Sequence, residues 1–228
     1  MQYFFNTGFP SRRFFCASEI IKKLLLGLVF CCLAAYVVAE TDSNKKLRIG
    51  LILDPNFGRI SSNEQNVESD GSKMGFAYGL TGDYYFAKNY AFSSGLSLIT
   101  INGQFVQRDT VTVLHNQYLQ IPLMLRLRAE LSSFGVFANF GFTTDFRLSS
   151  SKDVNSPVAA NNVSNRNASG DISVFRAGLL IGGGLEYNIT DDFTLFGGLI
   201  YNKGLTTIYK NDFNLKNNYL ALRLGVFF

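Results

Sequence analysis

The residues in this sequence with the greatest capacity for chemistry are charged side chains at alternate positions of otherwise apolar stretches. Both signs occur, on the face that the apolar residues leave free. Charges enclosed in a narrow interior need partners, because removing a charge from water is costly. We therefore expect a network of internal ion pairs, with a narrow polar path or a proton-coupled function as alternatives. The charged residues of this face are Arg48, Asp54, Asp83, Arg126, Arg128, Asp145, Arg147, Arg176, Glu186 and Arg223.

His115 is the only histidine in the chain and could in principle act as a general base. Base catalysis also needs a nucleophile within hydrogen-bond reach and a group that orients the base. The residues that follow, Asn116, Gln117 and Tyr118, form no serine-containing pattern of that kind. We predict a solvated loop histidine and no catalytic residue; a rim hydrolase that acts on lipid is the alternative.

No metal or cofactor site is predicted either. One histidine, with carboxylates on separate loops such as Asp109, Asp153 and Asp171, does not form a ligand set. The glycines from Gly178 to Gly184 lack the spacing of a phosphate-binding loop. Glycine in a barrel strand relieves curvature, which explains the cluster without a nucleotide.

The N-terminal segment has the pattern of a secretory signal peptide. Lys22 and Lys23 precede an apolar run over residues 24–38, and small residues lead up to a cleavage site between Ala39 and Glu40. This run is shorter than the about 20 residues that a membrane-spanning helix needs. A retained membrane anchor is the alternative, and the long start before Lys22 is consistent with a start codon placed too far upstream.

Cleavage at this site divides the chain into a signal peptide with an atypically long N-terminal region, 1–39, and a mature domain, 40–228. All three cysteines, Cys16, Cys31 and Cys32, lie in the first part, so no disulfide or lipid anchor is expected in the second. Four of the 21 basic residues and one of the 17 acidic residues also lie there. The mature domain is therefore nearly neutral, which predicts no nucleic-acid partner.

Alternation of apolar and polar residues at period 2 recurs along the mature domain, whereas no helical period persists. Asn, Asp, Ser and Gly separate the alternating segments, as expected of turns between strands. The pattern predicts an all-β domain of eight strands. These strands are expected at 47–58, 74–86, 90–105, 116–131, 134–148, 172–189, 193–209 and 218–228.

A secreted soluble β-sandwich would also alternate, but the lengths of strands and connections favour a membrane barrel. Most segments reach or exceed the about 9 to 11 residues with which a tilted strand crosses a membrane. Tight turns alternate with longer polar loops, as in transmembrane barrels. The turns are expected at Lys88-Asn89, Ser132-Ser133 and Asp191-Asp192, and the loops at 59–73, 106–115, 149–171 and 210–217.

Tyrosine and phenylalanine gather near strand ends, where a membrane barrel carries two aromatic girdles. The turn-side girdle is expected to contain Tyr84, Phe86, Tyr90, Phe92, Phe134, Tyr187 and Phe193. The loop-side girdle is expected to contain Phe57, Phe76, Tyr118, Phe146, Tyr209 and Tyr219.

Strands that cross lipid must close on themselves, because an open edge would leave amides and carbonyls without partners. We therefore predict an eight-stranded antiparallel up-and-down transmembrane β-barrel whose last strand ends at Phe228 and pairs with the first. Such a barrel is just wide enough inside for its own side chains, so the charges should plug it. Loop 149–171 is the best candidate for recognition, and its low apolar content predicts a surface feature rather than a packed plug.

One predicted strand contains a specific motif, whose residues are Tyr118, Leu119, Ile121, Pro122, Leu123 and Arg126. This motif resembles a strand of the PorT-like outer-membrane barrel family of Bacteroidetes. The resemblance extends over nearly all of the mature domain. Pro122 suits a barrel strand only where its missing donor falls at a bulge or an unpaired position.

The resemblance implies a function and partners. The C-terminal residues Leu222, Leu224, Val226 and Phe228 look like the signal by which the barrel-assembly machinery recognises its clients. The name-giving family member is implicated in type IX secretion. We thus expect a non-enzymatic protein of the bacterial outer membrane, in contact with lipid and with secretion-complex proteins, which supports secretion or envelope assembly. A structural or adhesive surface barrel and a small solute pore are the alternatives.

Overall fold

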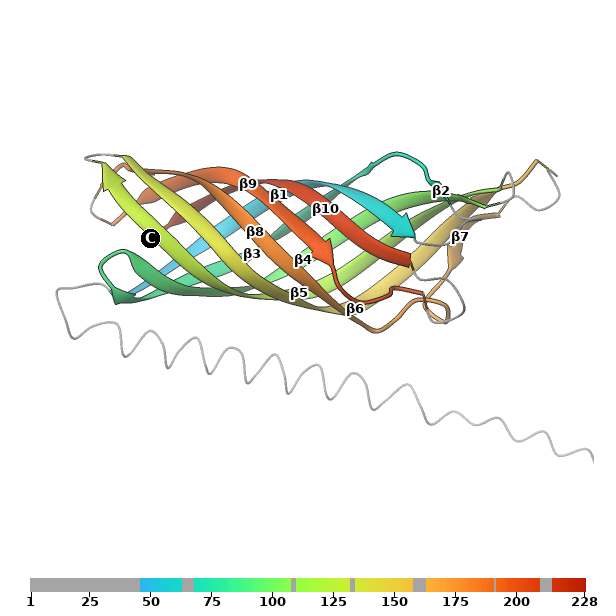
Figure 1. Ribbon diagram of the computed structural model, residues 1–228, viewed down its shortest axis with the longest axis horizontal. Helices are drawn as coiled ribbons and strands as arrows, with labels where there is room; N and C mark the ends of the chain where they lie inside the picture. The colour runs from blue at the N-terminus through green and yellow to red at the C-terminus, as the bar shows by residue number, and fades with distance from the viewer. Residues whose placement is uncertain are drawn as a thin grey trace, which may run out of the picture. The chain divides into compact units, whose positions relative to one another are not determined.

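Eight long antiparallel strands form a closed ring in the computed structural model of the protein (Figure 1). Each long strand pairs with the next along the chain, and the last pairs with the first. The predicted eight-stranded antiparallel barrel is confirmed. The long strands are β1 (Leu47–Ser62), β3 (Lys73–Ala87), β4 (Tyr90–Gln107), β5 (Thr110–Leu131), β6 (Phe134–Asn155), β8 (Phe175–Asn188), β9 (Thr194–Gly204) and β10 (Leu215–Phe227).

The structure describes residues 46–62, 68–107, 110–131, 134–157, 163–190, 192–209 and 215–228. The predicted signal peptide, with cleavage between Ala39 and Glu40, lies outside these residues, as do the turn at Ser132-Ser133 and Asp191. Among the described residues, no helix is long and apolar enough to cross a membrane.

The ring closes between β1 and β10, where Leu51 lies opposite Val226 and Phe57 opposite Leu220. β10 ends at Phe227, one residue before its predicted end, but the backbone N–H of Phe228 still donates to the carbonyl of Ile49 at 3.0 Å. These contacts supply the partners that an open edge would lack.

In the described strands, the prolines of the ring lie only where the hydrogen-bonded ladder between two neighbouring strands is interrupted. Between β4 and β5 the register passes from Ser94 opposite Leu123 to Ser97 opposite Gln120, so Pro122 has no partner on that side. The Ser94 hydroxyl donates instead to the Pro122 carbonyl at 2.8 Å. The expected unpaired position of Pro122 is thus confirmed, and the β1–β10 ladder is interrupted in the same way at Pro55.

One end of the barrel, here called the turn end, carries the tight connections. Lys88 and Asn89 form the predicted turn between β3 and β4. Between β8 and β9, the N–H of Ile189 donates to the carbonyl of Phe193 at 2.9 Å. The opposite end, called the loop end, carries two further short strands, β2 (Glu68–Ser69) and β7 (Val163–Asn167).

The sheet continues beyond the ring at the loop end, which the sequence did not lead us to expect. β5 begins at Thr110 and β6 runs to Asn155, so the predicted loop 106–115 is wrong and 149–171 is partly strand. β2 pairs with β4 and β7 with β6, which gives a five-stranded sheet in the order β2–β4–β5–β6–β7. Two predicted strands are instead shorter, because the chain is irregular before Phe175 and after Gly204.

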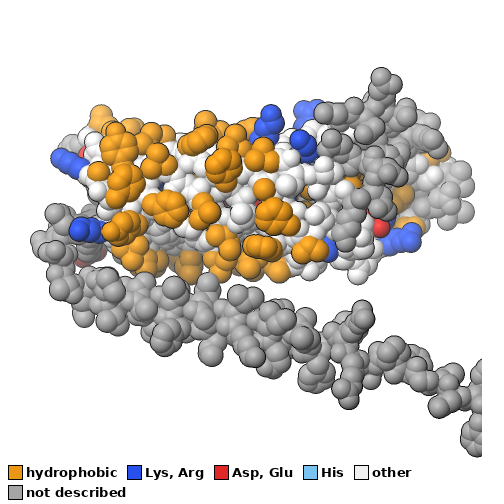
Figure 2. Space-filling model, turned by 60° about the horizontal axis from the view of Figure 1, so that its bottom comes forward, with side chains coloured by type: hydrophobic (Ala, Val, Ile, Leu, Met, Phe, Trp, Pro, Cys, Tyr) orange, Lys and Arg blue, Asp and Glu red, His pale blue; other side chains and the backbone are white. Residues whose placement is uncertain are grey.

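Apolar side chains cover the outside of the ring (Figure 2). On β6, Val136, Phe140 and Phe142 are exposed, while Asn139, Thr143 and Asp145 on the opposite face are buried. All predicted members of the turn-side girdle are exposed, as are Phe57, Phe76 and Phe146 at the other border.

Two members of the loop-side girdle were assigned to the wrong face. Tyr118 and Tyr219 are buried in the lumen, because both occupy inward positions in the alternation of their strands. Tyr209, a third member, packs against a buried apolar cluster.

Candidate functional site

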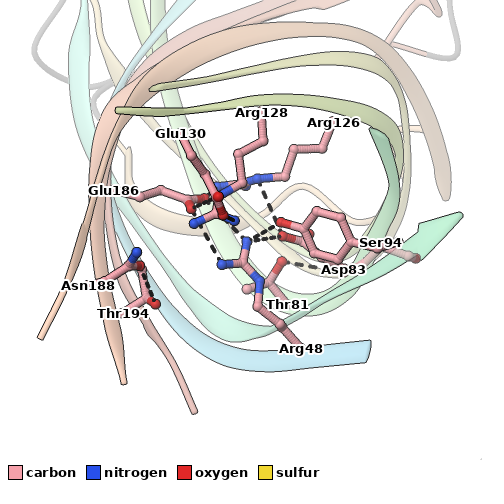
Figure 3. Close-up of polar contacts among 11 residues, drawn as sticks. Arg48, Thr81, Asp83, Ser94, Arg126, Arg128, Glu130, Glu186, Asn188 and Thr194 are labelled. Atoms are coloured by element: carbon pink, nitrogen blue, oxygen red, sulfur yellow. Dashed lines mark hydrogen bonds and ion pairs between the residues drawn. The ribbon is translucent and has the colours of Figure 1, made fainter. Parts of the chain in front are cut away.

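Five charged side chains converge inside the turn end (Figure 3) and are called here the turn-end charge cluster: Arg48, Asp83, Arg126, Arg128 and Glu186. They come from β1, β3, β5 and β8, which bring residues far apart in sequence to one level of the lumen. Alternation places each of them on the inward side of its strand. Closure of the ring then sets their separation.

Glu186 is the centre of this cluster. Its carboxylate accepts hydrogen bonds from Arg126 and, at 2.6 Å, from Nε of Arg128, and Arg48 approaches it at 3.3 Å. Asp83 is the second anion, with Arg48 at 3.2 Å and Nε of Arg126 at 3.3 Å. Both carboxylates are fully buried, so each relies on the arginines in place of water.

Aromatic rings form the wall beside the cluster. The Arg126 guanidinium carbon lies 3.9 Å from the centroid of Phe137, and that of Arg48 lies 4.4 Å from the centroid of Phe227. Phe196 stacks on Phe227 with ring centroids 4.5 Å apart. These cation–π contacts fix the planes of the guanidinium groups and exclude water from one side of the cluster.

Asp54 and Arg223 form a separate buried pair across the β1–β10 seam. Nε of Arg223 donates to both carboxylate oxygens at 3.1 Å, and its terminal nitrogen donates to one of them at 2.7 Å. The pair spans the place where the ladder is interrupted. Because two nitrogens of one guanidinium donate to one carboxylate, the pair fixes the orientation of both side chains as well as balancing their charges.

A second group, the loop-end charge cluster, comprises Asp145, Arg176, Gln120, Tyr219 and Asn202. Arg176 donates to Asp145, to the amide oxygen of Asn202 at 2.5 Å and to the carbonyl of Asn217 at 2.7 Å. Gln120 donates to Asp145 at 2.9 Å and to the Tyr219 hydroxyl at 3.1 Å. Three of these residues are uncharged, so the pattern of charges in the sequence did not predict them. Their inward positions in the alternation of apolar and polar residues were the signal that could have identified them.

Arg147 does not join an ion pair among the described residues. It donates instead to the backbone carbonyls of Ser169 and, at 2.9 Å, of Ile172. It therefore holds the segment after β7 against the barrel.

An apolar plug fills the loop end. Ala168 and Ile172 bring the segment after β7 into contact with buried residues of the long strands and of the segment after β9. The expected surface character of loop 149–171 holds for β7, whose residues are mostly exposed, but not for Ala168, which packs in this cluster because the strands supply the rest of the core. The plug consists of Ile60, Phe105, Leu114, Ala168, Ile172, Ile208 and Leu215.

His115 lies in β5 rather than in a loop. Its Nδ1 is 3.2 Å from Oδ1 of Asn102 and its Nε2 is 3.2 Å from Oδ2 of Asp153. Asp153 also accepts the backbone N–H of Asn165 at 2.6 Å, and this hydrogen bond lowers the pKa of the Asp153 carboxyl below its usual range. The group links β4, β5, β6 and β7, and its neighbours are an amide and a carboxylate rather than a nucleophile.

The remaining candidates are divided between the lumen and the lipid-facing side. Of the family strand motif, Leu123 is exposed, Leu119 and Ile121 are half-buried, and Tyr118 and Arg126 point inward. Leu222, Leu224 and Phe228 are exposed and Val226 is half-buried. An apolar groove of about 750 Å³ crosses β3, β1, β10 and β9 around Gly197, and its position on the outer surface makes it part of the lipid-facing wall. The described residues contain no group of three potential metal ligands.

A closed ring with an apolar outside and a filled, charged lumen defines an integral β-barrel membrane protein. The sequence matches the family described as outer membrane protein beta-barrel domain over residues 38–210, so the chain belongs to that family. It resides in the bacterial outer membrane. In barrels of this kind the short turns face the periplasm and the longer loops face the exterior.

Several solved structures resemble the chain at low identity. Neisserial surface protein A is 16% identical with a TM-score of 0.43, and the match covers 78% of this chain and 95% of that one. OprG from Pseudomonas aeruginosa is 15% identical with a TM-score of 0.42, covering 80% and 95%. Ail from Yersinia pestis, solved with a heparin analogue, is 14% identical with a TM-score of 0.41, covering 80% and 99%. A search of curated proteins finds no match.

The centre of the turn-end charge cluster gives a testable prediction. Glu186→Gln leaves three arginines facing a neutral amide, so we expect the free energy of unfolding to fall by about 3–5 kcal/mol. Glu130→Gln removes an exposed partner of Arg128 and should cost less than about 1 kcal/mol. Urea titration of both variants in lipid vesicles measures the difference. Equal effects of the two substitutions would contradict a central role for Glu186.

The contact between Asp153 and Asn165 should depend on pH. A lowered pKa in the folded protein means that the contact stabilises β7 above the unfolded pKa of about 3.9 and is lost as pH falls through the folded value. We expect the hydrogen-exchange protection factor of the Asn165 amide to fall in that acidic range. In Asp153→Asn this dependence should disappear, and a wild-type protection factor that stays constant under acid would disprove the assignment.

Proposed function

We propose that this barrel is a non-enzymatic, non-conducting protein that supports protein secretion or envelope assembly by binding other proteins. The observation that carries the proposal is the filled lumen. The turn-end charge cluster, the loop-end charge cluster and the apolar plug all occupy its interior. A lumen occupied by paired charges and packed apolar side chains leaves the outer surfaces for function.

The sheet at the loop end offers a contact surface. Its marginal strands are β2, which pairs with β4 and also contacts β1 through the Arg59–Ser69 hydrogen bond, and β7, which among the described residues pairs only with β6. The outer side of β7 can accept an extended segment of a partner through backbone hydrogen bonds. Contacts of this kind suit a protein that holds an assembly together at the membrane.

The secretion role rests on the resemblance of the strand from Tyr118 to Arg126 to the PorT-like motif. Type IX secretion moves cargo across the outer membrane, where this chain resides. We also propose that Leu222, Leu224, Val226 and Phe228 form the signal read by the barrel-assembly machinery. Leu222 and Leu224 are exposed on the outward face of β10, and Phe228, directly after the strand, is exposed as well, which supports that role.

Conductance tests the filled lumen. In planar bilayers we expect the purified wild-type barrel to give small openings or none, because the ion pairs and the plug would have to separate before ions could pass. Steady, large openings would contradict the proposal and favour a solute pore.

Export measurements test the secretion role. Deleting the gene should reduce the export of type IX cargo, and wild-type protein supplied from a plasmid should restore it. Unchanged export would remove the secretion role and leave the barrel assignment intact.

A surface function is the second candidate, favoured by the sheet at the loop end. Normal export together with reduced attachment of the deletion strain to surfaces would support that alternative.

A further inference from the structure

Three basic side chains gather on the lipid-facing side of the barrel at the border of its loop end. Arg59 on β1 lies opposite Asn218 of β10, and Lys216 of β10 lies opposite Ser61. On the other side of β10, Tyr219 lies opposite Asn202, which brings Lys203 of β9 beside Asn218. The three residues Arg59, Lys203 and Lys216 are called here the basic border patch.

The Asn218 side chain occupies the middle of the patch and fixes its strands. It accepts a hydrogen bond from the backbone N–H of Gly204 at 2.9 Å and donates to the Ser61 hydroxyl at 3.0 Å. Neighbours across a ladder have Cβ atoms about 4.5–5.5 Å apart, and alternate residues on one strand are about 7 Å apart. Lys203 and Lys216 are diagonal neighbours on this surface, so their ammonium groups can reach one anionic group together, with Arg59 at the edge of the patch.

The patch adjoins the apolar belt on every strand that contributes to it. Phe57 and Tyr201 stand two residues closer to the membrane centre than Arg59 and Lys203, and Leu220 stands four residues closer than Lys216; they are 54%, 43% and 48% exposed. Each belongs to the same outward face as the basic residue beside it, because the alternation has period 2. Figure 2 shows Lys and Arg side chains at the borders of the hydrophobic surface.

The cations of the patch are not neutralised within the described part of the chain. None of the ion pairs there includes Arg59, Lys203 or Lys216. Nε of Arg59 donates to the Ser69 hydroxyl of β2 at 2.9 Å. Because β2 pairs with β4, this contact lies on the side of β1 away from β10, so Lys203 and Lys216 are the central cations of the patch and Arg59 lies at its edge.

We infer that the basic border patch binds the phosphate group of an anionic lipid of the outer leaflet. Arginine and lysine form short charge-assisted hydrogen bonds with phosphate oxygens, and basic residues at a membrane border attract anionic headgroups. A lipid fits better than free phosphate, because the adjoining residues Phe57, Tyr201 and Leu220 offer a surface for acyl chains. The contact would fix the height of the barrel in the membrane at the β9–β10–β1 side.

Native mass spectrometry of the purified full-length barrel with diphosphorylated lipid A tests this inference. Lys203→Gln/Lys216→Gln should weaken binding by about tenfold or more. The matched control, Lys46→Gln/Lys88→Gln, removes two exposed lysines at the turn end and should bind as the wild type does. Lys203→Arg/Lys216→Arg should retain binding, because the charge is kept.

Two ligand controls distinguish the source of the phosphate. Lipid A without phosphate groups should bind weakly to every variant, and inorganic phosphate should not displace the diphosphorylated lipid. Equal binding by wild type and Lys203→Gln/Lys216→Gln, or equal binding of the lipid without phosphates, would overturn the inference. Displacement by inorganic phosphate would assign the patch to free phosphate and overturn the lipid assignment.

Discussion

The rest of this structure depends on one requirement, that every backbone N–H and C=O group in the hydrocarbon layer has a hydrogen-bond partner within the protein. The β1–β10 seam meets it by joining the first long strand to the last. The same requirement explains the positions of Pro55 and Pro122, which stand where a ladder is already interrupted. A proline elsewhere in these strands would leave a carbonyl in the membrane without a donor.

Closure with eight strands also decides what the interior can contain. Within the apolar belt the outward positions are apolar, so charges at this level are confined to a lumen only wide enough for side chains. Each buried carboxylate is then stabilised by arginine, and the arginines of the turn-end charge cluster are in turn held by aromatic rings. Ion pairs enclosed in this way add little net stability by themselves, but losing one member leaves the others without compensation.

The periodicity of the sequence, together with the lengths of its strands and connections, was sufficient to predict the ring, because lipid on one side and a polar lumen on the other impose strict alternation over long strands. At the loop end this contrast disappears, since water or protein surrounds both faces. His115 and the residues after Ser149 therefore resembled loops, although they lie in strands. Tyr118 and Tyr219 show the opposite error, where closeness to a strand end was given more weight than an inward position in the alternation. The inward charges could be identified from the sequence, but their pairing could not, because it depends on the register between strands.

The pairing of β1 with β10 joins segments from opposite ends of the domain, so these residues meet only after the strands between them are in place. Contacts of such long sequence separation form slowly, because the entropy of closing the intervening chain is lost before the contact contributes any stabilising free energy. Until the seam forms, β1 and β10 both expose edges that can pair with other chains. The unfolded chain therefore faces its greatest risk of aggregation before insertion, and a chaperone that shields these two strands would protect it most effectively.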